Sequence, residues 1–346
     1  MRGAVSALRC IDPGPLATIQ DRGRLGWQRF GVSVAGAMDP VGLAVANLLV
    51  GNGPDAAAIE VTLYGGTWEA AAQSIRVAIA GATFNPTIDG QPVALHRAHT
   101  LKRGQKLALG AASDAARGYL AVAGGFDAKP VLGSASTHLR SRLGGFDGGP
   151  IRAGQDLALV LADAPAGPDL ALDPALLPPT PSRFRVILGP QDDAFTKEGI
   201  GTLFTGHYAI TAEADRMGMR LLGPSIAHAG GYNIISDGIA PGSIQVPGAG
   251  QPIVLFADRQ TTGGYPKIAT VISADLGFLA RCRPGTIVRF EKTDLAGAAA
   301  ARRALADRLA RLTVSLAPAR SRAALDSAHL LAHNLVDGVA DALAEP

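Results

Sequence analysis

The stretch that decides the fold is residues 253–273, IVLFADRQTTGGYPKIATVIS. Its two ends, residues 253–257 and 268–273, are short apolar runs rich in β-branched residues, which is typical of β-strands. Between them lies a polar loop, residues 258–267, that is far longer than a tight hairpin turn. Long loops in compact domains often carry function. We therefore predict two strands here and treat the loop as a candidate functional segment.

Short apolar runs separated by turn residues extend over most of the chain. With 43 Gly and 23 Pro, turns are frequent, which favours many short strands over a helical bundle. We predict further strands at residues 76–80, 87–89, 106–109, 118–123, 156–161, 184–188, 244–246 and 287–290. Asp39 followed by Pro40 predicts a helix start, with the helix ending near Gly51. Leu and Ala at helical spacing predict two more helices, at residues 295–312 and 323–343.

Residues 163–182 are rich in Pro and Ala and have no periodicity, as expected of a linker. We therefore expect an N-terminal β-rich region over residues 1–165, a linker over 166–182, a C-terminal β-rich region over 183–293 and a helical tail over 294–346. The fold class is mainly β, a β-rich α+β chain.

Charge and cysteine content limit the compartments and partners. The net charge is only +3, which does not require nucleic-acid binding. Cys10 and Cys282 are too few for a disulfide framework, so we expect a reducing compartment. The longest uncharged stretch, residues 238–257, is interrupted by Pro and Gly and is not typical of a membrane span. We expect a soluble cytoplasmic protein that binds neither nucleic acid nor membranes.

Several common chemistries are excluded by missing motifs. The chain has no phosphate-binding Gly-x-x-x-x-Gly-Lys-Ser/Thr loop, no dinucleotide-binding Gly-x-Gly-x-x-Gly between a strand and a helix, and no Gly-x-Ser-x-Gly elbow. No lysine adjoins a methionine, so biotin is not attached to this chain. The pairs His96/His99 and His329/His333 have ligand-like spacing but no accompanying Cys or carboxylate set, so we expect no metal.

The loop at residues 258–267 carries the groups that a small anion requires. Hydroxyl groups and exposed amides donate hydrogen bonds, glycines permit positive φ and close backbone approach, and a lysine adds a compact cation. These features favour a small carboxylate, bicarbonate or phosphate as ligand. The alternative is a turn in which Asp258 and Arg259 form a purely structural pair. The candidate residues are Asp258, Arg259, Gln260, Thr261, Thr262, Gly263, Gly264, Tyr265 and Lys267.

A second segment of this region carries two further candidates. Gln245 alternates with Ile244 and Val246 and so faces the opposite side, either as a ligand contact or as an outward polar residue. Asp237 lies in the same Gly- and Pro-shaped segment.

Arginines flank a glycine in residues 215–220, at Arg216 and Arg220. A guanidinium here could bind a carboxylate or hold Asp215 in place, and for Arg216 we favour the structural role. The turn at residues 189–193 is likewise interpreted as structural.

Polar residues also cluster near glycines in the first region, although the sequence around them does not identify any one of them as a catalytic acid or base. Asp39 has the simpler role of a helix cap. The first-region candidates are Asp21, Arg22, Asp39, Asn47 and Glu60.

Five segments, taken in order, resemble one protein family. They are residues 18–24 (TIQDRGR), 36–39 (GAMD), 46–52 (ANLLVGN), 215–218 (DRMG) and 258–267 (DRQTTGGYPK). They look like the family of biotin-dependent carboxyltransferases and 5-oxoprolinase C-type subunits, also called the KipA or allophanate-hydrolase-subunit-2-like family. The resemblance covers residues 14–292, and the 258–267 motif is its most specific part.

The resemblance implies two cyclophilin-like β-barrel regions and a partner of the KipI type, which is the B-type component of 5-oxoprolinase. With an A-type component, such a pair opens 5-oxoproline to glutamate at the expense of ATP with Mg. The same module occurs in urea carboxylase, where the matching loop reads Pro-Ser-Leu-Gly-Gly-Phe. Here it reads TTGGY at residues 261–265, and this departure favours 5-oxoprolinase.

On this interpretation the loop donates hydrogen bonds to a phosphate or oxyanion, while Lys267, Arg216 or Arg259 holds the substrate carboxylate. Asp258 or Asp237 is the candidate for proton transfer. The catalytic candidates are thus Asp258, Lys267 and Asp237. Two alternatives stay open. One is a biotin-dependent carboxyltransferase acting on a small amide, and the other is a non-enzymatic antagonist of a KipI-like kinase inhibitor.

Overall fold

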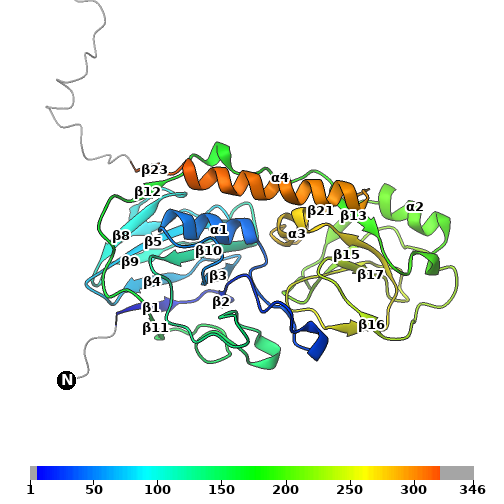
Figure 1. The fold of residues 1–346 in the computed structure, drawn as a ribbon, viewed down its shortest axis with the longest axis horizontal. Coiled ribbons are helices and arrows are strands. Elements are labelled where there is room, and N and C mark those ends of the chain that lie inside the picture. Colours follow the sequence, from blue (N-terminus) through cyan, green and yellow to red (C-terminus); the bar gives the residue numbers. More distant parts are fainter. Residues whose placement is uncertain (1–5, 320–346) are drawn as a thin grey trace, which may run out of the picture.

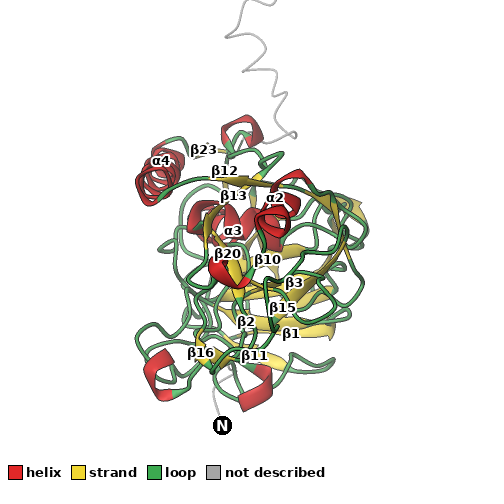
Figure 2. Ribbon diagram, turned by 90° about the vertical axis from the view of Figure 1, so that its right-hand side faces the viewer, coloured by secondary structure: helices red, strands yellow, loops and turns green. Residues whose placement is uncertain are grey.

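The computed structural model describes residues 6–319, in which two β-rich regions lie side by side (Figure 1). The long helix α4 (Leu295–Val314) runs across the top of both regions. It contacts α1 (Pro40–Leu49) of the first region and α3 (Ser273–Ala280) of the second. Seen at right angles, α4 lies at the outer edge of the molecule (Figure 2).

The first region consists of two antiparallel sheets with strand orders β11-β1-β4-β9-β6-β7 and β2-β3-β10-β5-β8. Their bounds are β1 Ala7–Asp12, β2 Ala17–Gln20, β3 Ala58–Thr62, β4 Thr67–Ala70, β5 Ser74–Gly81, β6 Thr87–Ile88, β7 Gln91–Pro92, β8 Ala98–Lys102, β9 Lys106–Ala108, β10 Arg117–Val122 and β11 Asp156–Ala158.

Side-chain alternation along β5 explains how this region is layered. Ile75, Val77 and Ile79 belong to the core that the two sheets share, together with Trp68 of β4. Ala78 and Ala80 point to the other face, where α1 packs. Because successive strand residues face opposite sides, one strand serves both layers, and its small residues allow the helix to approach closely.

The second region is a nearly closed barrel formed by one sheet of order β21-β14-β15-β18-β17-β20-β13-β22. The bounds are β13 Phe184–Leu188, β14 Tyr208–Ile210, β15 Gly218–Leu222, β17 Ser243–Gln245, β18 Ile253–Leu255, β20 Lys267–Val271, β21 Ile287–Val288 and β22 Phe290–Lys292. Only β13 and β22 pair in parallel. The edge strands β21 and β22 are adjacent in sequence, so the chain itself joins the two edges of the sheet.

Short elements complete the fold. Helix α2 (Lys197–Thr205) contacts β22. Two small sheets have two strands each. One pairs β12 (Leu170–Ala171) with β23 (Ala317–Pro318), and the other pairs β16 (Asp237–Gly238) with β19 (Thr262–Gly263). Single 3-10 turns occupy Gln28–Phe30, Leu139–Ser141, Pro174–Leu176 and Asp192–Ala194. Within residues 6–319, no helix combines the length and apolar character needed to cross a bilayer.

The proline-rich segment over residues 166–182 crosses between the two regions and is held on the protein surface. Its strand β12 pairs with β23, and Arg308 of α4 donates hydrogen bonds to the carbonyls of Leu176 and Leu177, at 3.1 and 2.8 Å. The segment therefore packs against the helix that follows the second region.

The mainly β fold class and the helix that begins after Asp39 are confirmed. The Asp39 carboxylate accepts a hydrogen bond from Val41 N at 3.1 Å, as a helix cap does. The helix expected over residues 295–312 is α4. The strand expected over 268–273 ends at Val271, because Ser273 begins α3, a helix that the sequence analysis missed together with α2. The helix expected over residues 323–343 lies outside the described residues.

Candidate functional site

The loop at residues 258–267 lies at the boundary between the two regions. Ser33 of the first region donates a hydrogen bond from its hydroxyl to the Arg259 carbonyl at 2.7 Å, and Ala35 N donates to the Ala257 carbonyl at 3.0 Å. Further along, Thr262 and Gly263 form β19, which pairs with Asp237 and Gly238 of β16. The loop is therefore anchored at both regions rather than free.

The glycine pair of this loop does not act through positive φ, contrary to the sequence interpretation. Neither Gly263 nor Gly264 is among the residues with positive φ. Space at Gly263 is tight, since a Cβ atom there would lie 2.8 Å from Gln245 Nε2 and 2.8 Å from the end of the Ile239 side chain. At Gly264 the nearest atom would be 3.5 Å away. Close approach of this backbone to a ligand stays a prediction.

Lys267 and Asp237 meet beside this loop. The buried ammonium of Lys267 donates to Asp237 Oδ2 at 2.9 Å, while half of the Asp237 side chain remains exposed. Gln191 Nε2 also donates to Asp237 Oδ2, at 3.1 Å, and Gln191 Oε1 accepts from Lys267 N at 3.3 Å. The hydrogen bonds from Lys267 and Gln191 lower the pKa of Asp237 from its ordinary value, so the carboxylate stays ionised at neutral pH.

A pocket of about 300 Å³ lies nearby, although neither Lys267 nor Asp237 is among the residues that line it. Tyr265 and Gln260 of the loop line it, as does Gln245, the strand partner of Lys267. Gln245 is buried, and its Nε2 donates to the Tyr265 carbonyl at 3.3 Å. The opposite wall is charged and is formed by Glu213, Asp215 and Arg220. The arrangement provides amides, an aromatic ring and one exposed guanidinium around a space of small-molecule size.

Arg216 and Asp258 lie elsewhere, in a buried charge cluster that joins the two regions. Arg216 donates to both oxygens of Asp258, at 3.0 and 2.9 Å, to Glu60 Oε1 at 2.6 Å and to the Gly36 carbonyl at 2.7 Å. Burial alone would lower the pKa of Arg216, but the two carboxylates outweigh it and raise that pKa. All three nitrogens of this guanidinium donate to protein groups, as the structural interpretation of Arg216 expected, although its main partners are Glu60 and Asp258 rather than Asp215.

Glu60 and Asp39 are linked through Tyr119. The Tyr119 hydroxyl donates to Glu60 Oε2 at 2.7 Å and accepts from Asp39 N at 2.8 Å, and Met38 N also donates to Glu60 Oε2 at 2.8 Å. Burial would raise the pKa of Glu60, but the charges of Arg216 and Arg117 lower it. These carboxylates are thus built into the packing between the regions.

Arg259 is likewise buried and hydrogen-bonded to protein groups. Its guanidinium donates to the carbonyls of Ile239 and Phe256, at 3.0 and 3.2 Å, and to Gln28 Oε1 at 2.7 Å. Burial lowers its pKa to about 10. One edge of Arg259 lines a second cleft, of about 340 Å³, between the regions. Its walls are mostly apolar and include Met38, Phe256 and Leu276, with Arg22 at the rim.

The remaining first-region candidates have structural partners. Asp21 accepts hydrogen bonds from Gly23 N, Ala135 N and the hydroxyls of Ser134 and Ser136, at 2.5–2.7 Å. Asn47 donates to the Ala56 carbonyl at 2.7 Å. Arg22 is exposed and lies 3.8 Å from Asp55.

The structure thus pairs Lys267 with Asp237 and brings Gln245, the strand partner of Lys267, to one pocket with Gln260 and Tyr265. Thr261–Gly264 belong to the same loop. Asp258, Arg216 and Glu60 lie in a separate buried cluster. Gln191 lies in the turn at residues 189–193, which the sequence pattern favours as structural, and only the fold brings it to Asp237. Arg220, which flanks the glycine of residues 215–220, has no local signal that marks it as a site residue. Within residues 6–319, no group of three or more His, Cys, Asp or Glu side chains is placed to hold a metal ion.

Comparison with known proteins agrees with the resemblance seen in the motifs. A family model described as "Carboxyltransferase domain, subdomain A and B" matches residues 30–292. The chain is 38% identical over 295 residues to the C-type subunit of 5-oxoprolinase from Haemophilus influenzae, covering 85% of this chain and 93% of that protein. It is 36% identical over 295 residues to the C-type subunit of 5-oxoprolinase from Escherichia coli, covering 85% of this chain and 94% of that protein.

More distant matches are parts of larger proteins. The urea amidolyase of Saccharomyces cerevisiae is 31% identical over 305 residues, covering 82% of this chain and 16% of that protein. The crystal structure of the K. lactis urea amidolyase has a TM-score of 0.83 at 26% identity, over 93% of this chain and 21% of that one. The crystal structure of TTHA0988 has a TM-score of 0.74 at 34% identity, over 83% of this chain and 55% of that one. The chain thus spans about a fifth of the first of these solved chains and just over half of the second.

Proposed function

Because this chain belongs to the carboxyltransferase-domain family, subdomains A and B, we propose that it is the C-type subunit of an ATP-dependent 5-oxoprolinase. The observation that carries this is the 38% identity to a protein of that name over 93% of its length. The urea amidolyase match, by contrast, is 31% identical and takes in only 16% of that protein. The proposed reaction is the opening of the lactam 5-oxoproline to glutamate.

The pocket between the 258–267 loop and Arg220 is the proposed substrate site. Arg220 has an exposed guanidinium, paired at 2.9 Å with the exposed Glu213. An exposed surface pair contributes little stability, so a substrate carboxylate can replace Glu213 at small cost. We assign this role to Arg220 because the guanidinium groups of Arg216 and Arg259 are buried and already donate to protein groups.

Asp237 and Lys267 are the proposed reactive pair. An ionised, half-exposed carboxylate is suited to accept a hydrogen bond from the lactam N–H or from the attacking water. Lys267 holds it in place and adds positive charge where an oxyanion develops. Thr261, Thr262 and the neighbouring amides are the proposed donors to the activated carbonyl oxygen. Asp258, bound on both oxygens by Arg216, is proposed to position the start of the loop rather than to move a proton.

Water attack on an unactivated lactam is slow and its equilibrium is unfavourable, so the proposal includes ATP with Mg, which would phosphorylate the amide oxygen. Attack of one water gives a tetrahedral intermediate whose collapse breaks the C–N bond, with the nitrogen taking up a proton, and leaves an acyl phosphate. A second water hydrolyses this acyl phosphate to the glutamate side-chain carboxylate and free phosphate. We assign ATP to the complex as a whole, formed with A-type and B-type partners in the cytoplasm, and no biotin to this chain. The chain is expected to be inactive without its partners.

The test is reconstitution. The chain is co-purified with its candidate A-type and B-type partners, and glutamate formed from 5-oxoproline is measured with and without ATP. Glutamate release that requires ATP and all three chains supports the proposal. Stable complex formation without turnover of any substrate would contradict it and favour an antagonist of a KipI-like protein.

A second function, carboxyl transfer from biotin to a small amide, is favoured by one observation. The fold similarity to the K. lactis urea amidolyase extends over 93% of this chain. The two functions differ in their co-substrates. Consumption of urea that depends on bicarbonate and on a biotin-carrying protein, without glutamate release from 5-oxoproline, would establish carboxyl transfer.

A further inference from the structure

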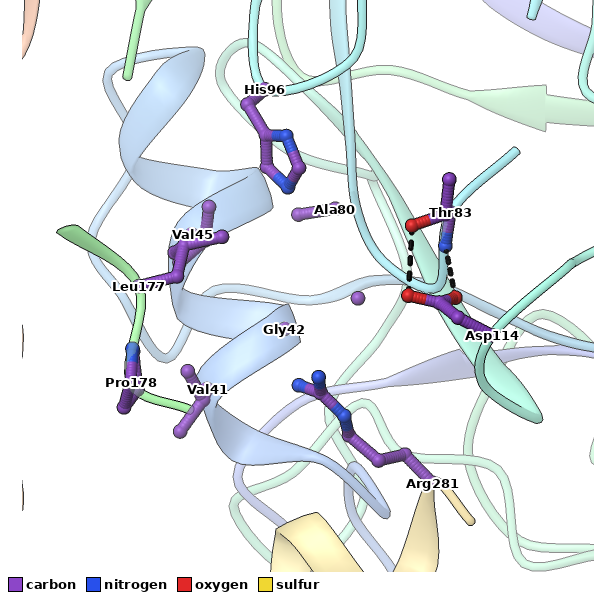
Figure 3. A pocket seen from close by; sticks show the side chains of 11 residues that line it. Val41, Gly42, Val45, Ala80, Thr83, His96, Asp114, Leu177, Pro178 and Arg281 are labelled. Atoms are coloured by element: carbon purple, nitrogen blue, oxygen red, sulfur yellow. Dashed lines mark hydrogen bonds between the residues drawn. The ribbon is translucent and has the colours of Figure 1, made fainter. Parts of the chain in front are cut away.

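A separate cavity lies between α1, the proline-rich connecting segment over residues 166–182 and the end of α3. It measures about 100 Å³, which is room for several water molecules or one small organic molecule. Val41 and Val45 of α1 form one wall, and Leu177 and Pro178 of the connecting segment form another (Figure 3). None of its lining residues belongs to the proposed substrate site.

Arg281 points into this cavity from below in Figure 3. Within the described part of the chain, its guanidinium makes no hydrogen bond. Its one carboxylate neighbour there is Asp39, with Nη1 3.6 Å from Oδ2, and it lies over the Phe278 ring at 5.5 Å. A guanidinium has five N–H donors, and one that is mostly buried normally finds acceptors for them. About four fifths of the Arg281 side chain is covered, so solvent satisfies only part of this demand.

The backbone fixes Arg281 at this position. Its carbonyl accepts a hydrogen bond from Ala116 N of the first region at 2.6 Å, and its N–H donates to the Gly277 carbonyl at 3.2 Å. These bonds hold the backbone from which the guanidinium extends at the boundary between the regions.

His96 faces Arg281 across the cavity (Figure 3). Its backbone has φ of +54°, a left-handed conformation that is uncommon for residues other than Gly and that here orients the ring. Burial lowers the pKa of this imidazole, so it is neutral at pH 7 and can donate or accept one hydrogen bond. Asp114 also lines the cavity, and its two oxygens accept hydrogen bonds from Thr83 N and Thr83 Oγ1, at 2.7 and 2.8 Å. Among the described residues, the ion-pair partner of Arg281 is Asp39 and not Asp114.

We propose that this cavity binds a small carboxylate. Its two oxygens pair with the Arg281 guanidinium, its short hydrocarbon part packs on Val41 and Val45, and His96 closes the opposite side. The planar, bidentate geometry of Arg with a carboxylate suits such a ligand, and the apolar walls favour a carboxylate over an inorganic anion. This site does not depend on the proposed function.

The test measures binding of sodium acetate and sodium propanoate by calorimetry at constant ionic strength. Both bind saturably, and propanoate binds about fourfold more tightly, because it buries one more methylene group. Arg281→Gln weakens binding by about tenfold or more. Arg283→Gln is the matched control, since that guanidinium donates to the Ser113 carbonyl and does not line the cavity, and it leaves the affinity unchanged.

Two further variants keep the result decisive. Glycine readily adopts the positive φ at position 96, so His96→Gly removes the imidazole ring without straining the backbone and leaves the Arg281–Asp39 pair in place. Weaker acetate binding is expected in this variant. It therefore tests the site even if Arg281→Gln does not fold. Arg220→Gln removes the proposed carboxylate partner of the substrate pocket and leaves acetate binding in this cavity unchanged, which separates this site from the proposed substrate site. Equal affinity for acetate in the wild type, Arg281→Gln and His96→Gly, or no saturable binding at all, would overturn the proposal.

Discussion

Arg216 of the second region and Glu60 of the first form a buried ion pair, with Nη1 2.6 Å from Oε1 and side chains that are 4% and 1% exposed. Asp258 lies on the other side of the same guanidinium. The pair therefore ties the strand β3 to the segment that begins the candidate loop. Because both charges are shielded from water, removing one partner leaves the other without compensation.

Arg216→Met is therefore expected to lower the free energy of unfolding by about 3–5 kcal/mol. Urea denaturation followed by circular dichroism measures the loss. Arg220→Met serves as the control, because its exposed pair with Glu213 contributes within about 0.5 kcal/mol. A loss of less than about 1 kcal/mol in Arg216→Met would show that the buried cluster is not what joins the regions.

The dependence of stability on pH should report Glu60. Its pKa is lowered in the folded state from an ordinary value of 4.5, so its ionisation stabilises the fold at pH values above 4.5 and this contribution is lost as the pH falls through the folded-state pKa. Glu60→Gln lacks this contribution. The difference in unfolding free energy between wild type and Glu60→Gln should thus be constant near neutral pH and shrink on acidification below 4.5. A difference that grows on acidification would contradict this assignment.

Asp39 works in the opposite direction. Burial raises its pKa, so its ionisation costs stability above its ordinary value of 3.8 and protonation favours the fold. The dependence of the wild-type unfolding free energy on pH therefore contains opposing contributions from Glu60 and Asp39. The comparison with Glu60→Gln separates them.

Tyr119→Phe tests the hydroxyl that links Glu60 to Asp39 N. Its removal leaves one buried acceptor and one buried donor with fewer partners, so a loss of about 1–3 kcal/mol in unfolding free energy is expected. Tyr265→Phe, at an exposed ring, is the matched control and should stay near the wild-type value. Thermal unfolding of the two variants in parallel provides the comparison, and equal melting temperatures would contradict the prediction.

The glycine pair of the loop gives a second matched comparison. A Cβ at position 263 would meet Gln245 and Ile239, whereas one at position 264 finds open space out to 3.5 Å. Gly263→Ala should displace Gln245 and cost about 1–3 kcal/mol in stability, while Gly264→Ala should be nearly neutral. Urea denaturation measures both, and the reverse order would show that the loop is arranged differently.

The sequence allowed prediction of the elements whose signals are local. Asp39 and Pro40 mark the start of α1, and short β-branched runs between glycines mark most of the strands. Helix α3 was missed because residues 268–273 continue as one apolar run across the point where β20 ends and the helix begins. Its hydrophobicity is spread around the helix, so no periodic stripe reveals it.

The candidate site was predictable only in part, because hydrogen bonding depends on distant segments. The motif identified the 258–267 loop, but nothing local shows that Asp258 turns to Arg216 while Lys267 turns to Asp237. Gln191 lies 76 residues before Lys267, and only the pairing of β13 with β20 brings their segments together. In the structure, the first residue of this motif, Asp258, thus belongs to a buried structural cluster, whereas Gln260 and Tyr265 of the same motif line a pocket.

The central claim, that Asp237 and Lys267 act together at the substrate pocket, is tested most directly by turnover in the reconstituted complex. Lys267→Met and Asp237→Asn are each compared with wild type for ATP-dependent glutamate release, after melting temperature and partner binding have been matched. Each variant is expected to lose about a hundredfold or more in kcat, and the double variant little more than either single one, because the residues act as a unit. Wild-type turnover in both folded, partner-bound variants would contradict the account.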